Sequence, residues 1–180
     1  MGIAITGLLK AKELSFDELK DKKLAIDAFN MLYQFLSTIR QRDGSLLTDS
    51  EGKVTSHLVG LFARTTNLME KGIKLVFVFD GVIPDLKQEE RERRKSLKIE
   101  AQRKYELAAA KEDIEAMKKF ASRTSILSKG MIEESKELIS ALGLPVIQAP
   151  SEGEAQASYM VKKNKVYGKK PSWNTKKLGC

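Results

Sequence analysis

Three short apolar runs, each followed by acidic or turn residues, organise this chain. They are Lys-Lys-Leu-Ala-Ile-Asp-Ala (22–28), Lys-Leu-Val-Phe-Val-Phe-Asp-Gly (74–81) and Leu-Pro-Val-Ile-Gln-Ala (144–149). Apolar runs of this length, bounded by turn residues, predict buried strands. The segments between them show helical periodicity, and alternation of strands with helices favours a parallel sheet. We therefore expect an α/β fold with a mostly parallel sheet flanked by helices.

The expected helices differ in character. One begins near residue 29, another spans about 55–71, and a third spans 135–142 and is closed by a glycine. Residues 85–120 are helix formers with few large apolar side chains. A helix of that composition is too polar to pack deeply into a core, so we expect it to project from the sheet edge.

Four carboxylates stand where the predicted strands end. They are Asp27, Asp80, Glu152 and Glu154. In open parallel sheets the carboxyl ends of the strands form the ligand crevice, so these side chains are expected to converge there. Oxygen ligands without His or Cys suit Mg²⁺, with Mn²⁺ as a second possibility.

A structural explanation is open for each carboxylate. Ser151 and Glu154 fit the S-x-x-E capping box of the following helix, and Glu152 would complement its dipole. Asp27 would cap the helix that follows it, and Asp80 precedes a glycine, an ordinary turn signal. The coincidence of three acidic strand ends on one edge favours the metal interpretation.

Composition excludes little beyond a disulfide framework. The net charge is +8, but residues 162–180 hold seven of the 32 lysines and arginines and none of the 24 acidic residues. Bulk charge therefore barely argues for nucleic acid. The single cysteine, Cys180, and the lack of a signal-like or membrane-spanning run favour an intracellular protein. The only histidine, His57, lacks partners for a ligand set and is expected to be structural.

A basic stripe follows the second strand. Lys87, Arg91, Arg94 and Lys98 are spaced by four, three and four residues. A helix aligns such positions on one face, which suits a phosphate backbone. The alternative is a solvated helix held by pairs such as Glu90–Arg94. The stripe begins soon after Asp80, which favours nucleic acid.

Several motifs together resemble one family. They are the start Met-Gly-Ile, Ala-Ile-Asp-Ala with Tyr-Gln-Phe-Leu (33–36), Thr-Ser-His-Leu-Val-Gly, Val-Phe-Val-Phe-Asp-Gly and, most specific, Ala-Pro-Ser-Glu-Gly-Glu-Ala-Gln-Ala. About residues 1–167 are similar to flap endonucleases, structure-specific 5′ nucleases, of archaeal type. The resemblance implies a PIN-like 5′ nuclease fold, incomplete at the C-terminus, with a projecting helical arch. It also implies metal-assisted cleavage of 5′ flaps and 5′-3′ exonuclease trimming of DNA in replication and repair.

The resemblance also implies residue roles. Asp27, Asp80, Glu152 and Glu154 correspond to ligands of a site that holds two ions, Mg²⁺ or Mn²⁺, in the complete family. Lys87 and Arg94 correspond to catalytic residues that clamp the scissile phosphate. The DNA-binding candidates, from the resemblance and the basic stripe, are Gly2, Tyr33, Arg40, Arg64, Arg91 and Lys98.

Four regions follow from this assignment. Residues 1–98 form an N-terminal nuclease region, 84–130 a helical arch that overlaps both neighbours, 116–167 the start of an internal nuclease region, and 168–180 a disordered basic tail. The family would continue into an Asp-x-Asp strand, a further metal-binding Asp, a helix-hairpin-helix element and a sliding-clamp motif. We therefore expect a truncated or frame-shifted chain with impaired activity.

The sequence also leads to expectations about binding partners, and it leaves two alternative functions open. The implied partner is DNA with a 5′ flap or 5′ end, whereas the sliding-clamp motif of the family is absent from this sequence. We expect a monomer without a membrane partner, cytoplasmic in an archaeon and nuclear in a eukaryote. The start Met-Gly-Ile-Ala-Ile-Thr fits an N-myristoylation pattern but lacks a second membrane signal. A non-catalytic DNA-binding fragment and a small metal-dependent ribonuclease remain alternatives.

Overall fold

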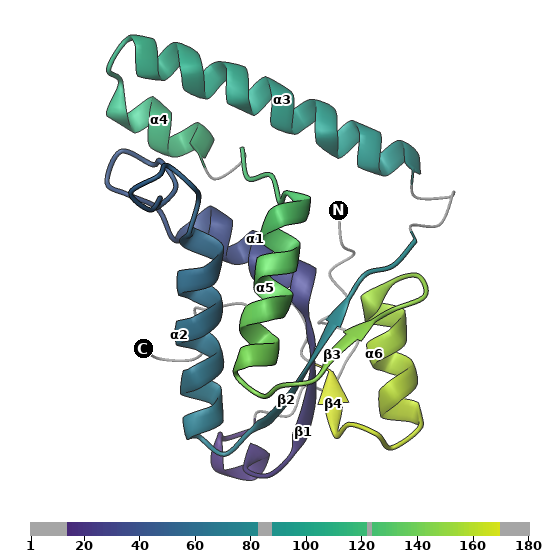
Figure 1. Ribbon diagram of the computed structural model, residues 1–180. Helices are drawn as coiled ribbons and strands as arrows, with labels where there is room; N and C mark the ends of the chain where they lie inside the picture. Colours follow the sequence, from purple (N-terminus) through teal and green to yellow (C-terminus); the bar gives the residue numbers. More distant parts are fainter. Residues whose placement is uncertain (1–13, 83–87, 122–123, 170–180) are drawn as a thin grey trace.

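The computed structural model describes residues 14–82, 88–121 and 124–169, and its centre is a parallel sheet (Figure 1). The strands are β1 (Lys23–Asp27), β2 (Lys74–Phe79), β3 (Val146–Gln148) and β4 (Gly168–Lys169). Their order is β3-β2-β1-β4, and all the pairings are parallel. The three predicted strands and the α/β class are therefore confirmed.

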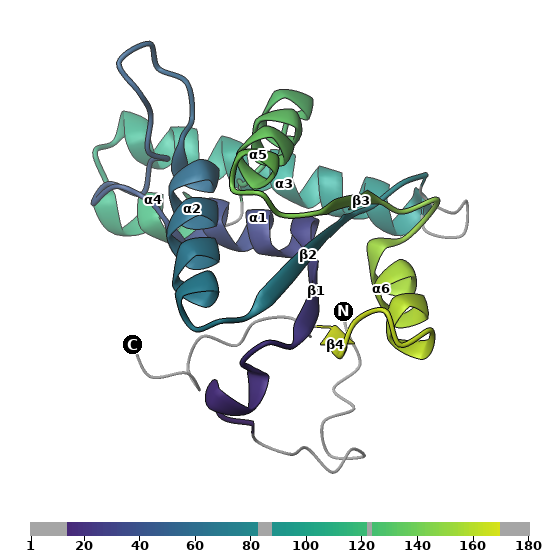
Figure 2. The same ribbon diagram turned by 60° about the horizontal axis from the view of Figure 1, so that its bottom comes forward.

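Helices cover both faces of the sheet (Figure 2). A short 3-10 helix, η1 (Asp17–Leu19), precedes β1. The helices around the sheet are α1 (Ala28–Thr38), α2 (Ser56–Glu70), α5 (Lys129–Ala141) and α6 (Gly153–Lys162). Helices α1, α2 and α5 share one core with the sheet, and α6 shares the other.

Alternate strand residues supply these two cores. Phe77 and Phe79 pack with α1, α2 and α5, whereas Val76 and Val78 pack with Met160 of α6. Successive strand side chains point to opposite faces, so a strand covered on both sides must be apolar at every position. The continuous apolar run of β2 is explained in this way.

Two element boundaries differ from the sequence expectation. Helix α5 begins at Lys129 rather than near Ser135, because the Ser128 hydroxyl caps it by accepting the Met131 N–H at 3.2 Å. Strand β4 begins at Gly168, inside the segment assigned to the disordered tail, and pairs with Leu24 and the next residue of β1. Residues 170–180 lie outside the described part of the chain.

A helical hairpin stands at one end of the molecule. It consists of α3 (Gln88–Ala110) and α4 (Ile114–Ala121), which pack against each other (Figure 1). The predicted projecting helical structure is therefore present. In the described ranges, no helix combines the length and apolar character needed to cross a membrane.

Candidate functional site

Asp27 and Asp80 lie at the same edge of the sheet. In the β1–β2 register Asp27 stands opposite Val78, and Asp80 comes two residues later, just after the end of β2. The Asp27 carboxylate accepts the Asn30 N–H at 3.0 Å and caps α1. The capping interpretation of Asp27 is thus confirmed. It does not exclude a metal role, because a carboxylate offers further acceptor sites.

Asp80 connects this edge to the acidic motif after β3. Its Oδ1 accepts the Gly153 N–H at 2.6 Å, at the start of α6. Glu152 is the N-cap residue of α6, and no side-chain cap hydrogen bond is made there. The helix therefore begins with its N-cap at Glu152, one residue after Ser151, where the alternative capping-box interpretation would place the cap. A carboxylate from another strand satisfies a free N–H group of the first turn instead.

The loops after β2 and β3 approach each other closely. Gly81 N–H donates to the Ser151 carbonyl at 2.5 Å, and the Gln148 side-chain amide donates to the Asp80 carbonyl at 2.5 Å. A Cβ on Gly81 would overlap the carbonyl oxygen of Ala149. This spacing requires glycine at position 81. Sequence reasoning missed Gln148, whose only signal was a polar residue ending an apolar strand.

Electrostatics tie three of the carboxylates together. Burial raises the pKa of the Asp27 carboxyl, and the hydrogen bond from Asn30 opposes that shift. The charges of Asp80 and Glu154 raise the pKa of Asp27 further. A partly buried carboxylate that faces two others is an arrangement a divalent cation would relieve.

The spacing of the carboxylates is open. Among the residues that the structure describes, no three acidic, His or Cys side chains are grouped closely enough to hold a metal. Glu152 is half-buried and Glu154 is exposed at the start of α6. Because Mg²⁺ commonly keeps several waters and takes only one or two carboxylates directly, this open arrangement still fits it.

Substitution of Asp80 separates its two roles. Asp80→Ala removes the acceptor of the Gly153 N–H and should lower the free energy of unfolding by about 1–2 kcal/mol, as loss of a helix cap does. Asp80→Asn keeps an acceptor oxygen and should cost less. Both variants should weaken Mg²⁺ binding in calorimetry. Unchanged Mg²⁺ affinity in both would reduce Asp80 to a helix cap.

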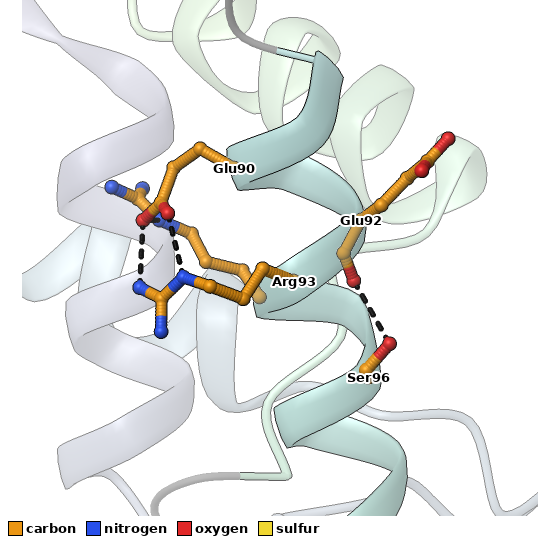
Figure 3. A network of polar contacts seen from close by, with 5 residues as sticks. Glu90, Glu92, Arg93 and Ser96 are labelled. Atoms are coloured by element: carbon orange, nitrogen blue, oxygen red, sulfur yellow. Dashed lines mark hydrogen bonds and ion pairs between the residues drawn. The ribbon is translucent and has the colours of Figure 1, made fainter.

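Arg94 belongs to an ion cluster at the start of α3, of which Figure 3 labels Glu90 and Arg93. The Glu90 carboxylate accepts from Nε of Arg94 at 2.8 Å and from Nε and Nη2 of Arg93 at 2.7 and 2.9 Å. Hydrogen bonds from the two arginines lower the pKa of Glu90 to about 2. The expected Glu90–Arg94 pair is confirmed. Two guanidinium groups share one carboxylate, so the cluster keeps a net positive charge.

Lys98 faces the body of the protein. Its Nζ lies 4.3 Å from the ring centroid of Tyr33, on α1. Burial against that ring, and secondarily the charge of Arg94, lower the pKa of Lys98. Arg94 and Lys98 also line a pocket of about 430 Å³ between α3 and α4, together with Lys104 and Phe120. The pocket was not predicted. Its only signal in the sequence was Phe120, an aromatic residue in the polar helical segment 85–120.

The remaining candidates differ in placement. Arg64 is half-buried on α2, and Arg40 is turned into the protein, where it donates to the Gly44 carbonyl at 2.8 Å. Gly2 and Lys87 lie outside the described residues, as does the side chain of Arg91.

His57 occupies a buried position on α2. Its Nε2 lies 3.3 Å from Oε2 of Glu134, without hydrogen-bond geometry, and Lys53 pairs with the same carboxylate. Burial lowers the pKa of His57. This setting supports the structural interpretation.

The site therefore consists of carboxylates at the C-terminal ends of parallel strands, with a basic helical hairpin beside them. Residues 1–101 match the XPG N-terminal domain, and residues 143–169 match the XPG I-region. The chain belongs to the flap endonuclease 1 family, which confirms the resemblance seen in the sequence.

Similar proteins and solved structures support the same family. Flap endonuclease 1 of Thermococcus onnurineus is 53% identical over 167 residues, covering 93% of this chain and 49% of that protein. Flap endonuclease-1 from Methanococcus jannaschii superposes with a TM-score of 0.67 at 45% identity, covering 93% of this chain and 53% of that one. The catalytic core of Rad2 in complex with DNA substrate gives 0.62 at 32% identity, covering 88% of this chain and 41% of that one. The chain spans about half the length of the curated relatives it matches.

Proposed function

We propose that this chain carries the carboxylate site and the helical clamp of a structure-specific 5′ nuclease. Its reaction is Mg²⁺-dependent hydrolysis of DNA at 5′ flaps, with 5′-3′ exonuclease trimming, in replication and repair. One observation carries the proposal. The Asp80–Gly153 hydrogen bond brings the ends of β1 and β2 and the acidic start of α6 to one edge, in a chain of this family.

The carboxylates have the chemistry to hold the metal. Asp27, Asp80, Glu152 and Glu154 would share up to two ions of Mg²⁺, with Mn²⁺ as a substitute. Such ions supply an activated water and charge stabilisation at the leaving 3′ oxygen. Two carboxylates hold backbone N–H groups as well, which fixes their orientation.

The basic helix supplies the phosphate contacts. Lys98 of α3 contacts α1 through the ring of Tyr33. Arg94 lies one helical turn nearer the start of α3. We assign Arg94, with Lys87, to neutralising charge on the scissile phosphate. Residues 84–130 then form the clamp between the nuclease regions 1–98 and 116–167.

Binding of the DNA partner would involve more of the surface. Tyr33 is 37% exposed, and its aromatic ring suits stacking with a base of a 5′ flap or 5′ end. The DNA-binding proposals are Gly2, Tyr33, Arg40, Arg64, Arg91 and Lys98. The relative Rad2 was solved with its DNA substrate, which supports a DNA partner here. We propose that the chain acts on DNA as a monomer.

A non-catalytic DNA-binding role is the second candidate. The net positive charge of the Arg93, Arg94 and Glu90 cluster on α3 favours it. The basic stripe would then hold DNA by counterion release without cleavage.

Cleavage assays separate these functions. A 5′-flap duplex, a plain duplex and single-stranded RNA are each incubated with the chain in Mg²⁺ and in chelator. We expect Mg²⁺-dependent cleavage of the flap, lost in Glu152→Gln and kept in Glu137→Gln, which removes an exposed carboxylate on α5. Salt-sensitive DNA binding without cleavage would support the second candidate. Cleavage of RNA alone would make the chain a ribonuclease.

A further inference from the structure

The loop between α1 and α2 is held together by consecutive backbone contacts. Two antiparallel bridges lie within it, and they join Arg40 to Leu46 and Thr48 to Val54. Between the bridges, the Leu47 N–H donates to the hydroxyl of Ser56, the first residue of α2, at 2.8 Å. Figure 2 shows the loop extending beyond the N-terminal end of α2. Because the contacts are consecutive, a movement of the outer part of the loop reaches Arg40 at its base.

Residues 49–53 form the turn at the outer end of this loop. The Asp49 N–H donates to the Lys53 carbonyl at 2.9 Å, and the Lys53 N–H donates to the Asp49 carboxylate at 2.8 Å. The Lys53 ammonium pairs with Oε1 of Glu134, which lies on α5. Within the described ranges, this ion pair is the polar contact that joins the turn to another element.

Glu134 also faces the buried histidine of α2. Its Oε2 lies 3.3 Å from Nε2 of His57, and neither atom has a hydrogen-bond partner in the described part of the chain. His57 is fully buried, and burial lowers its pKa. A neutral imidazole cannot balance the charge of a carboxylate, and a partly buried carboxylate without a counter-charge is unfavourable. The cation that balances Glu134 is therefore Lys53.

We propose that Glu134 is a positioning residue, which anchors the loop between α1 and α2 to α5 through Lys53 and so keeps Arg40 in place for DNA. The purpose of the anchor rests on the proposed function, whereas the anchor itself does not. Without the charge of Glu134, residues 49–53 would lose their ion pair with α5, and the backbone contacts behind them would open more often. Arg40 would then be in place for a smaller fraction of the time, which weakens substrate binding rather than the chemical step.

Three variants and one control, all in the full chain, test the anchor. Glu134→Gln keeps the shape of the side chain and removes its charge. Lys53→Met removes the ammonium from a side chain that is 63% exposed, and Lys53→Arg keeps a cation and serves as the rescue. Glu137→Gln removes an exposed carboxylate about one turn further along α5 and is the matched control. Thermal unfolding confirms that each variant is folded before comparison.

An NMR titration of His57 measures the anchor directly, because both partners act on its ring. The charge of Glu134 raises the pKa of His57, and the charge of Lys53 lowers it. The pKa of His57 should therefore fall in Glu134→Gln, rise in Lys53→Met and stay unchanged in Lys53→Arg and in Glu137→Gln. A general loss of stability would not shift one pKa in opposite directions. An unchanged pKa of His57 in either Glu134→Gln or Lys53→Met would overturn the proposal.

Amide hydrogen exchange measures the loop. The N–H groups of Leu47 and Lys53, which are held inside the loop, should exchange about 10-fold faster in Glu134→Gln and Lys53→Met, as loss of a charge-assisted contact implies. Both groups should exchange at the wild-type rate in Lys53→Arg and Glu137→Gln. Wild-type exchange in both charge-removing variants would show that the loop does not depend on Glu134, contrary to the proposal.

Cleavage kinetics on a 5′-flap duplex test the purpose of the anchor. KM should rise about 5-fold in Glu134→Gln and Lys53→Met while kcat stays unchanged. Removal of a negative charge should by itself favour DNA, so bulk charge would not explain a higher KM in Glu134→Gln. An unchanged KM in both variants, or a fall in kcat alone, would overturn the positioning role. If the wild type cleaves no flap DNA, the proposed function fails, whereas the His57 and exchange measurements still decide whether Glu134 anchors the loop.

Discussion

Replacement of Asp27 by Asn is expected to stabilise the metal-free chain by about 1 kcal/mol, as removal of unfavourable functional groups commonly does. Asn caps a helix as well as Asp, so the bond to the Asn30 N–H is retained. What is lost is a partly buried charge that Asp80 and Glu154 repel. The same change should lower Mg²⁺ affinity at least about 10-fold, the loss typical of weakened metal sites.

The stabilisation should depend on pH in a defined direction. Because the pKa of Asp27 is raised in the folded state, the unfolded chain ionises this carboxyl more readily. Stability linked to Asp27 is therefore fully present below the unfolded pKa of about 4 and is lost as pH rises through the folded value. The advantage of Asp27→Asn should be absent at low pH and complete at neutral pH.

Thermal unfolding in chelator, at pH 7 and pH 3.5, measures this advantage, and calorimetry measures Mg²⁺ binding. Asp49→Asn, in the turn-rich loop after α1, removes a carboxylate away from the strand-end carboxylates and is the control. A variant that is less stable than the wild type in chelator at pH 7 would contradict the argument. Undiminished Mg²⁺ affinity would remove Asp27 from the metal site.

The sheet and most helices could be predicted because their signals are local. The apolar run of β2 is continuous because both of its faces are buried, and that requirement is visible in five consecutive residues, 75–79. The true start of α5 was missed because Gly130, a weak helix former, follows the capping residue Ser128. The hydrogen bond that the Ser128 hydroxyl accepts from the Met131 N–H allows the helix to begin there.

The candidate site was predictable only in outline. The acidic residues that follow the strands could be placed at the same edge of the sheet from the expected topology alone. The hydrogen bond between Asp80 and Gly153 joins residues that are 73 positions apart, and no local pattern signals it. The local S-x-x-E motif would place the N-cap at Ser151, whereas the helix is capped from Glu152 onward. Long-range pairing overrides a local preference when it satisfies the same N–H group.

Arg40 shows the same limit for charged residues. An arginine beside a turn has the sequence signature of an exposed phosphate contact, yet its partner Ser125 lies 85 positions away. The sequence gives no sign of that partner, because a serine in a connecting segment has many possible roles. Charge patterns thus located the basic helix but could not tell which cations are exposed and which are turned into the protein.

Replacement of Gly81 by Ala is expected to lower the free energy of unfolding by about 2–3 kcal/mol, the cost of forcing atoms into a closely packed site. The new Cβ would overlap the carbonyl oxygen of Ala149 and lie 2.8 Å from the backbone of Pro150. These neighbours are backbone atoms and cannot rotate away, so the loops after β2 and β3 must separate. Separation would break the bond from Gly81 N–H to Ser151.

The same separation should reach the proposed metal site, because Asp80 precedes Gly81 and Glu152 follows Ser151. We expect Mg²⁺ affinity to fall together with stability in Gly81→Ala, measured by calorimetry and by urea unfolding. Gly130→Ala is the matched control, since its Cβ would meet only the Ser128 hydroxyl at 3.8 Å in a helix, where alanine is favoured. It should bind Mg²⁺ normally and unfold no more easily than the wild type. If Gly81→Ala behaves like Gly130→Ala, the two loops are not held as closely as the structure indicates, and the convergence of the carboxylates loses its main support.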